Sequence, residues 1–425
     1  MKILIKNGRV IDPSQEIDAN LDILIEDGCI TQLDNDIDPL GMDEVIDANG
    51  LLVTPGLIDI HVHLRDPGYE YKEDIVTGTR SAAAGGFTSL ACMPNTNPVN
   101  DNKALTAYMI NKGRIEGSAN VYPICTITKS QKGKSLVEMG DLKQAGCVGF
   151  SDDGLNVDCG EVVRRAMEYA SGFDMPIIAH AEDDAIKAGG VMNEGRVSTE
   201  LGLTGNTWVA EAATISRDLL LAELTGARLH VCHISTRRAV ELIREAKKKG
   251  VRVTCEVTPH HFTLTEEAVR GYDVNAKMGP PLRTDDDVAA MKEGLADGTI
   301  DAIATDHAPH HIDDKNVEFN VAANGLVGME TALPLTLRLV EEKILTLNQA
   351  IHCLTAKPAQ ALNIPRGTLN IGSPADIAII DPELKWTVDT TKMYSKAHNT
   401  PFQGCEMTGA AMLTLRDGKT TFERK

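Results

Sequence analysis

The sequence predicts an α/β fold, a (β/α)8 TIM-like barrel joined to a small β-sandwich domain built from both termini. Eight strand candidates alternate with helical segments in the middle of the 425-residue chain, and eight is the strand number of such a barrel. Both ends of the chain consist instead of short strands and turns. We therefore place the composite β domain at residues 1–54 and 366–425 and the barrel at residues 55–365.

The two β-rich ends are recognised by short apolar runs bounded by turn dipeptides. Ile3–Ile5 and Leu21–Glu26 are strand candidates near the start, where Asn-Gly and Asp-Gly pairs mark turns. Ala375–Ile380 is a strand candidate near the end, and Leu413–Phe422 has the pattern of a hairpin. Because both terminal segments are β-rich and the middle of the chain is not, we expect the two terminal segments to form one small domain together.

The middle of the chain contains the strands of the predicted barrel. They are Gly56–His63, Thr88–Met93, Val121–Thr126, Val148–Ser151, Pro176–His180, Arg228–His233, Arg252–Val257 and Ala302–Asp306. Helical segments such as Glu161–Ser171, Val209–Thr225 and Arg237–Lys249 lie between most of them, and glycines often close these helices. A doubly wound open sheet is the alternative. Its dinucleotide-binding version is disfavoured because no GxGxxG motif follows the first strand.

Charge and cysteine content exclude several classes of partner and site. The net charge is −19, so the surface repels phosphates, and neither nucleic acid nor membrane is an expected partner. No signal-peptide pattern opens the sequence, and no run of about 18 apolar residues occurs. The nine cysteines are odd in number and never spaced as CxxC, which disfavours disulfides and thiolate zinc sites. We expect a cytoplasmic protein in which an anionic substrate would need a local cationic site.

Imidazoles and carboxylates gather at the carboxyl ends of five predicted strands, where a barrel carries its active site. His61 and His63 stand two apart and therefore share one face of the first strand. Four histidines and two aspartates exceed the needs of one tetrahedral zinc, which favours two ions with a shared carboxylate. Manganese, cobalt and iron are rarer options than zinc. The candidate ligands are His61, His63, Asp153, His180, His233 and Asp306.

Six short motifs at the predicted strand ends and loops are informative as a set. They are Pro55–His63 (PGLIDIHVH), His63–Gly68 (HLRDPG), Met93–Thr96 (MPNT), Ser151–Gly154 (SDDG), Ala304–His310 (ATDHAPH) and Asn399–Phe402 (NTPF). The first motif resembles the opening of the amidohydrolase superfamily, a family of metal-dependent barrels. The set as a whole resembles dihydroorotases of the long bacterial type. This resemblance spans nearly the whole chain, including both β-rich ends.

The resemblance implies an enzyme with a two-metal centre. Dihydroorotases are zinc-dependent cyclic amidohydrolases that reversibly interconvert N-carbamoyl-L-aspartate and L-dihydroorotate in pyrimidine (UMP) biosynthesis. Asp306 matches the catalytic residue that moves the proton, and Asp153 matches the bridging ligand. Two zinc ions per subunit are implied, bridged by Asp153 and a hydroxide. The first would be held by His61, His63 and Asp306, and the second by His180 and His233.

The resemblance also implies a substrate pocket. Its matching positions are His63, Arg65, Asn95, Gly279, His310, Asn324 and Gly325. Arg65, Asn95 and His310 would hold the α-carboxylate of the substrate, a task suited to a guanidinium fork and an amide. Asn324-Gly325 match a family position whose backbone contacts the substrate. The alternative is that this pair forms only a turn. Gly279 replaces an asparagine that usually contacts the ring, so water or backbone must serve there.

Two alternative functions are open at this point. Hydantoinases, dihydropyrimidinases and allantoinases share the barrel but normally have a lysine on the fourth strand, and residues 148–154 contain none. An inactive structural partner of aspartate transcarbamoylase would lack metal ligands, whereas all six are present here. The expected partners are a small-molecule substrate and a second copy of the chain in a homodimer. Association with aspartate transcarbamoylase is a further option.

Residues next to the candidate ligands receive weaker assignments. Asp152 is expected to be structural or to support a ligand, and His307 to pack or to orient its neighbour. His230 has no supporting pattern. Cys232 precedes His233 on its strand, so its side chain is expected to point away from the barrel interior.

Overall fold

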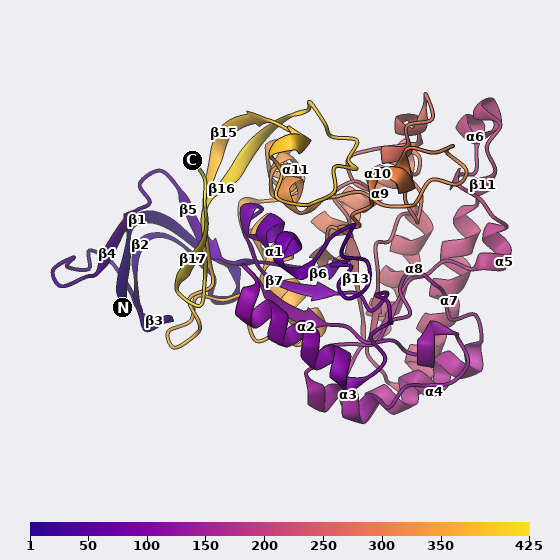
Figure 1. The fold of residues 1–425 in the computed structure, drawn as a ribbon, viewed down its shortest axis with the longest axis horizontal. Helices are drawn as coiled ribbons and strands as arrows, with labels where there is room; N and C mark the ends of the chain where they lie inside the picture. The colour runs from indigo at the N-terminus through magenta and orange to yellow at the C-terminus, as the bar shows by residue number, and fades with distance from the viewer.

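The computed structural model describes all 425 residues, with a β-rich part at one side and a larger α/β part at the other (Figure 1). The strands are β1 (Lys2–Asp12), β2 (Ile17–Glu26), β3 (Cys29–Asp34), β4 (Glu44–Asp47), β5 (Leu52–Pro55), β6 (Leu57–Val62), β7 (Phe87–Cys92), β8 (Asn120–Pro123), β9 (Ile177–Ala179), β10 (Met192–Asn193), β11 (Gly205–Asn206), β12 (Leu229–Val231), β13 (Val253–Val257), β14 (Ala302–Ile303), β15 (Ile377–Thr387), β16 (Glu406–Arg416) and β17 (Lys419–Glu423). The helices are α1 (Ile75–Ala84), α2 (Lys103–Glu116), α3 (Met139–Ala145), α4 (Gly160–Ser171), α5 (Asp184–Lys187), α6 (Arg196–Leu201), α7 (Trp208–Thr225), α8 (Arg237–Lys248), α9 (Asp285–Ala296), α10 (Ile312–Lys315), α11 (Met329–Glu341), α12 (Leu347–Leu354) and α13 (Ala356–Leu362).

Strands from both ends of the chain form one mixed sheet. Its order is β17-β16-β15-β5-β1-β2-β3, with β4 beside β1. The two ends meet where β15 pairs antiparallel with β5, from Ile377 opposite Pro55 to Ile380 opposite Leu52. A composite β unit is therefore present, while its boundaries at 54/55 and 365/366 stay a prediction.

This sheet differs from the expected two-sheet sandwich. All eight strands are linked by hydrogen bonds into a single sheet, although side chains from its two halves share one core. Ile5 and Ile23 from the N-terminal strands pack in that core with Ile377, Ile379 and Leu415 from the C-terminal strands. The alternating apolar pattern identified the strands, but it does not say whether their edges pair.

Eight parallel segments of the middle region are connected in a closed ring. One sheet has the order β6-β7-β8 and another the order β14-β13-β12-β9. Phe150 joins them through parallel bridges to Cys125 and Ile177, and a parallel bridge from Val62 to His307 links the remaining edges. Seven of the eight predicted strands appear as strands. The fourth, Val148–Ser151, is reduced to the bridging residue Phe150.

The ring separates two apolar cores. On β6, Leu57 and Val62 belong to the large core shared with the surrounding helices, whereas Ile58 and Ile60 belong to a smaller cluster with Ala91, Ile178 and Ala302. The three named helix predictions are confirmed by α4, α7 and α8 to within one residue. Helix α7 ends at Gly226 with a φ of 67°, a left-handed conformation that glycine adopts without strain. No helix has the length and apolar character needed to cross a bilayer.

Candidate active site

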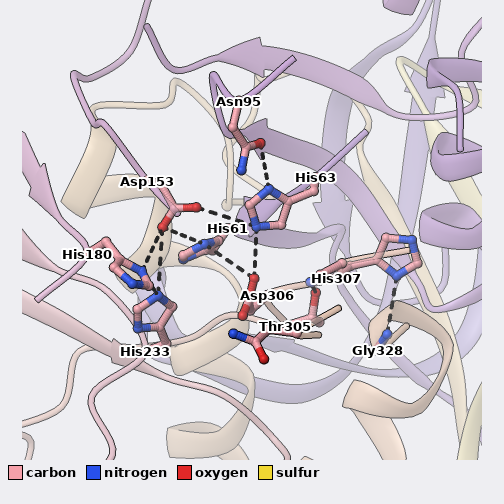
Figure 2. Close-up of polar contacts among 12 residues, drawn as sticks. His61, His63, Asn95, Asp153, His180, His233, Thr305, Asp306, His307 and Gly328 are labelled. Atoms are coloured by element: carbon pink, nitrogen blue, oxygen red, sulfur yellow. Dashed lines mark hydrogen bonds and ion pairs between the residues drawn. The ribbon is translucent and has the colours of Figure 1, made fainter. Parts of the chain in front are cut away.

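Six polar side chains converge at the carboxyl ends of the ring segments (Figure 2). His61 ends β6, Asp153 follows the Phe150 segment, and His180 and His233 follow β9 and β12. Asp306 lies just beyond β14. The structure thus brings together all six side chains predicted as metal ligands, from five segments that are far apart in the sequence.

Asp153 lies at the centre of this group. Its Oδ1 is 3.4 Å from His180 Nδ1, 3.7 Å from His233 Nε2 and 3.5 Å from His61 Nε2. Its Oδ2 is 3.6 Å from His63 Nε2. Burial by itself would raise the pKa of Asp153, but the charge of His61 and the nearby imidazoles of His180 and His233 lower it well below the usual value. A buried, ionised carboxylate with one oxygen facing each side can bridge two cations.

The remaining ligand candidates also point their acceptor atoms inward. Asp306 Oδ1 is 3.0 Å from His63 Nε2 and 3.5 Å from His61 Nε2. His180 Nδ1 and His233 Nε2 are 2.9 Å apart, so both nitrogens aim at one small space. His61 Nε2 and Asp153 Oδ1 are buried without a hydrogen-bond partner. Buried polar atoms are normally satisfied, and a bound cation would satisfy these two. The donor set therefore fits divalent metal ions.

Glu256 on β13 is a site residue that the sequence prediction missed. Its Oε1 is 2.5 Å from His61 Nδ1, and its Oε2 is 3.1 Å from His230 Nε2. Burial would raise the pKa of Glu256, but the charge of His61 and hydrogen bonds with His230 and His61 lower it to about 2. The carboxylate is thus ionised and keeps the proton of His61 on Nδ1, which leaves Nε2 free to bind a metal. An acidic residue among the apolar side chains of a strand that ends at Val257 was the signal available in the sequence.

Removing the charge of Glu256 should weaken metal binding. We expect Glu256→Gln to reduce zinc affinity by about 10- to 100-fold, because a ligating histidine loses the carboxylate that orients it and raises its basicity. Competition with a chromogenic chelator measures this affinity. Glu330→Gln is the matched control, since Glu330 accepts hydrogen bonds from Ser81 and Tyr394 away from the site. Zinc affinity equal to that of the wild type would show that Glu256 has no such role.

Two other ligand candidates have their second nitrogen near an acceptor. His63 Nδ1 is 2.9 Å from Asn95 Oδ1, so Asn95 orients a ligand in addition to any contact with substrate. His180 Nε2 is 3.8 Å from a carboxylate oxygen of Glu182, which also forms an ion pair with Lys187. These contacts fix which nitrogen of each ring faces the centre.

A polar cavity of about 200 Å³ is lined by five of the six ligand candidates, all but the fully buried His61. Its walls include all seven positions predicted for substrate binding, namely His63, Arg65, Asn95, Gly279, His310, Asn324 and Gly325. Arg65 donates from Nε to the carbonyl of Pro309 at 3.2 Å and forms no ion pair with a carboxylate of the chain. An unpaired guanidinium in a small cavity can bind an anionic group.

Three site residues have left-handed backbone conformations that are uncommon for residues other than glycine. The φ angles are 60° for Arg65, 29° for His233 and 48° for Asp306. Such conformations cost of order 1–3 kcal/mol each and tend to occur at functional sites. They turn these side chains toward the cavity at points where regular strand geometry has ended.

The prediction that Cys232 points away from the interior is wrong. Its Sγ lies within 4.8 Å of ligand atoms of His61 and Asp153, and its side chain packs in the inner cluster with Ile58 and Ile178. Side chains do not alternate in direction here as they do along a strand, because β12 ends at Val231 and the backbone has left strand geometry by His233. Burial raises the pKa of the Cys232 thiol, so it stays protonated and is a poor ligand beside imidazoles and carboxylates.

Asp152 and His307 lie where supporting roles were predicted. Asp152 accepts hydrogen bonds from the backbone of Ile127 and Thr128, away from the centre. His307 Nδ1 accepts from the backbone of Gly328, and its Nε2 faces Glu73 at 3.6 Å.

Comparison with known proteins identifies the family. A family model described as "Dihydro-orotase-like" matches residues 50–239, and an "Amidohydrolase family" model matches residues 161–422. A dihydroorotase from Syntrophotalea carbinolica is 62% identical over 422 residues, which cover 99% of both chains. The chain belongs to the dihydroorotase family. A dihydroorotase from Geobacter metallireducens, 59% identical over the full length of both chains, agrees with this assignment. This dihydroorotase-family chain is accordingly a cyclic amidohydrolase.

Solved structures with the same fold include other cyclic amidases. The L-hydantoinase (dihydropyrimidinase) from Arthrobacter aurescens is 27% identical, with a TM-score of 0.89 over 99% of this chain and 96% of that one. A D-hydantoinase is 23% identical, with a TM-score of 0.85 over 100% and 96% of the two chains. At this level of identity the second likeness concerns the fold alone. The much higher identity to dihydroorotases outweighs both in assigning the family.

Proposed function

We propose that the chain interconverts N-carbamoyl-L-aspartate and L-dihydroorotate at a centre of two zinc ions in a (β/α)8 barrel. The observation that carries this proposal is the position of Asp153 among four histidines and Asp306, beneath a cavity that contains an unpaired guanidinium. The closed ring of eight parallel segments supports the barrel. The experiment that tests the function is turnover of L-dihydroorotate by the purified chain.

Each zinc ion would have its own set of ligands. His61, His63 and Asp306 would hold the first ion, because Asp306 Oδ1 lies closest to the Nε2 atoms of these two histidines. His180 and His233 would hold the second, since their facing nitrogens are 2.9 Å apart. Asp153 would bridge the ions, since its Oδ2 faces His63 and its Oδ1 lies among His61, His180 and His233.

Hydrolysis adds water to the ring amide carbonyl, breaks the C–N bond and transfers a proton to the leaving nitrogen. When bound, the zinc ions would lower the pKa of the attacking water and polarise the carbonyl oxygen. Asp306 would take the proton from this water and deliver it to the nitrogen. Burial would raise the pKa of Asp306, but the charge of His61 and the contact with His63 hold it below its usual range, so the carboxylate is ionised. In synthesis, Asp306 removes a proton from the carbamoyl nitrogen.

The α-carboxylate of the substrate would bind at the wall that contains Arg65, Asn95 and His310. Arg65 supplies the positive charge, and Asn95 has its Nδ2 left to donate because its Oδ1 faces His63. His310 Nε2 is 2.8 Å from the carbonyl oxygen of Asn324. A carboxylate would therefore share this N–H with the loop.

Gly279 leaves part of the cavity wall without a side chain. A Cβ at this position would approach Asn324 Nδ2 to 3.2 Å. We propose that water or the backbone at Asn324-Gly325 contacts the ring there. A homodimer, a cytoplasmic location and an association with aspartate transcarbamoylase stay predictions from the sequence.

Arg65→Ala should impair substrate handling without removing metal. Hydrogen bonds to charged groups contribute roughly 1.5–3 kcal/mol, so we expect kcat/KM for L-dihydroorotate to fall at least about tenfold. Steady-state kinetics measure the effect, and elemental analysis of the same sample checks the metal content. Arg217→Ala is the control, because Arg217 is paired with Asp218 outside the cavity. Unchanged kinetics in Arg65→Ala would refute the assignment.

A further inference from the structure

Two buried lysines hold the loop that forms one wall of the cavity. Lys315, at the end of α10, donates from Nζ to the carbonyl oxygens of Ala323 at 2.8 Å and Gly325 at 3.0 Å. Lys277 donates from Nζ to the carbonyl oxygens of Asn320 at 2.9 Å and Ala322 at 2.7 Å. Four carbonyls of the loop 320–325 therefore point at two ammonium groups.

These amino groups have no carboxylate partner, and burial lowers the pKa of both lysines, to about 7 for Lys315. The side chains are 5% exposed at Lys277 and 2% at Lys315, and neither forms an ion pair with an acidic residue. Burying a charge without an opposite charge is costly unless hydrogen bonds replace the lost water. A purely structural role could be filled by an apolar side chain at lower cost. The placement of both charges behind a wall of the cavity suggests a role in the site.

The peptide groups of the loop alternate in direction. Carbonyls 323 and 325 point to Lys315, while the carbonyl between them, on Asn324, points to His310 Nε2 at 2.8 Å. The N–H of Gly325, in the same peptide plane as the Asn324 carbonyl, points the other way and donates to the backbone of Lys277 at 2.9 Å. The Asn324 N–H, which lies opposite carbonyl 323, donates to no group of the chain.

We propose that Lys315 is a positioning residue for substrate binding. Its hydrogen bonds to the carbonyls of Ala323 and Gly325 orient the peptide group of Asn324, and the carbonyl of Asn324 in turn fixes His310. Because the carbonyl of Ala323 points to Lys315, the N–H of Asn324 in the same peptide group points away from the lysine and toward the cavity that Asn324 lines. Asn399 assists from another side, since its Nδ2 donates to the carbonyls of Ala308 and Gly325. This inference rests on the proposed substrate contacts of His310 and Asn324-Gly325.

Replacing Lys315 by methionine removes the ammonium group at nearly constant volume. We expect KM for L-dihydroorotate to rise at least tenfold, kcat to stay within about threefold and zinc content to be unchanged. A contact made equally in the bound and transition states affects KM alone, whereas damage to the metal centre would lower kcat. Lys315→Gln keeps one donor group and should give a smaller rise in KM. If Lys315→Met does not fold, the Gln variant decides the question by the same criterion.

A double-mutant cycle separates positioning from a general loss of structure. If Lys315 acts through His310, the effect of Lys315→Met on KM should shrink at least threefold in a His310→Ala background. Arg228→Met is the matched control, because Arg228 also donates to backbone carbonyls, of Gln360 and Ala361, outside the cavity. Its KM should equal that of the wild type.

Two results would overturn the inference, namely an unchanged KM in folded Lys315 variants, or additive effects in the cycle. The wild type is assayed first with L-dihydroorotate. Absence of turnover there would contradict the proposed function, whereas an active wild type with an unchanged Lys315→Met would contradict this inference alone.

Discussion

Asp306→Asn should remain nearly inactive in both directions of the reaction even when both metal sites are full. Asp306 lies 3.0 Å from His63 Nε2, lines the cavity and has a left-handed backbone that turns it toward the other ligand candidates. An amide can coordinate weakly through its oxygen but has no basic site comparable to a carboxylate. General acid–base catalysis supplies roughly 10²–10⁴-fold, so a loss of kcat in about that range should survive metal saturation.

The measurement for Asp306 requires activity and metal occupancy on the same sample. If Asp306 is only a ligand, Asp306→Asn should lose metal, and added zinc should partly restore the rate. Activity close to the wild type with both sites full would exclude Asp306 as the proton carrier. His307 and His310 would then be the next residues to test.

Removal of metal should abolish turnover in the wild type. Five other ligand candidates surround Asp153, and two atoms of the set, His61 Nε2 and Asp153 Oδ1, are buried with no partner within the chain. Binding to zinc lowers the pKa of water from about 15.7 to about 7, so we expect the metal-free enzyme to lose at least about a hundredfold in rate at neutral pH. Elemental analysis should find more than one divalent ion per chain, chiefly zinc.

Recovery after removal tests whether the effect comes from the metal. Dialysis against a chelator followed by addition of zinc should restore the rate in the wild type. Asp153→Ala should recover little, because it lacks the carboxylate that faces both groups of histidines. Full turnover by the stripped wild type would contradict a metal-dependent reaction.

Much of the fold could be predicted because local patterns determine it. Apolar runs and helix-ending glycines identified seven ring strands and the helices α4, α7 and α8. The segment around Phe150 is hydrogen-bonded to both neighbouring segments but forms only single bridges, to Cys125 and Ile177, so it is too short to count as a strand. Whether the end strands form one sheet or two depends on edge pairing, which a single sequence does not encode locally.

The site residues could also be predicted only where a local sequence pattern marks them. The ligand candidates were predictable because histidines and aspartates recur at the ends of five strands, which isolated core histidines would not do. Glu256 contacts His61, which is far away in the sequence, and Lys315 contacts only backbone carbonyls, so neither had a motif to mark it. Cys232 was misplaced because strand alternation was extended past Val231, where the backbone of His233 departs from strand geometry.

The most direct test compares two substrates of the metal-replete chain. L-dihydroorotate and dihydrouracil share the ring amide, but only the former has the carboxylate that Arg65 would bind. We expect efficient reversible turnover of L-dihydroorotate and a kcat/KM for dihydrouracil at least about tenfold lower, because one charge-assisted contact is lost. Hydrolysis of dihydrouracil as fast as that of L-dihydroorotate, or no turnover of L-dihydroorotate with both metals bound, would contradict the proposed function.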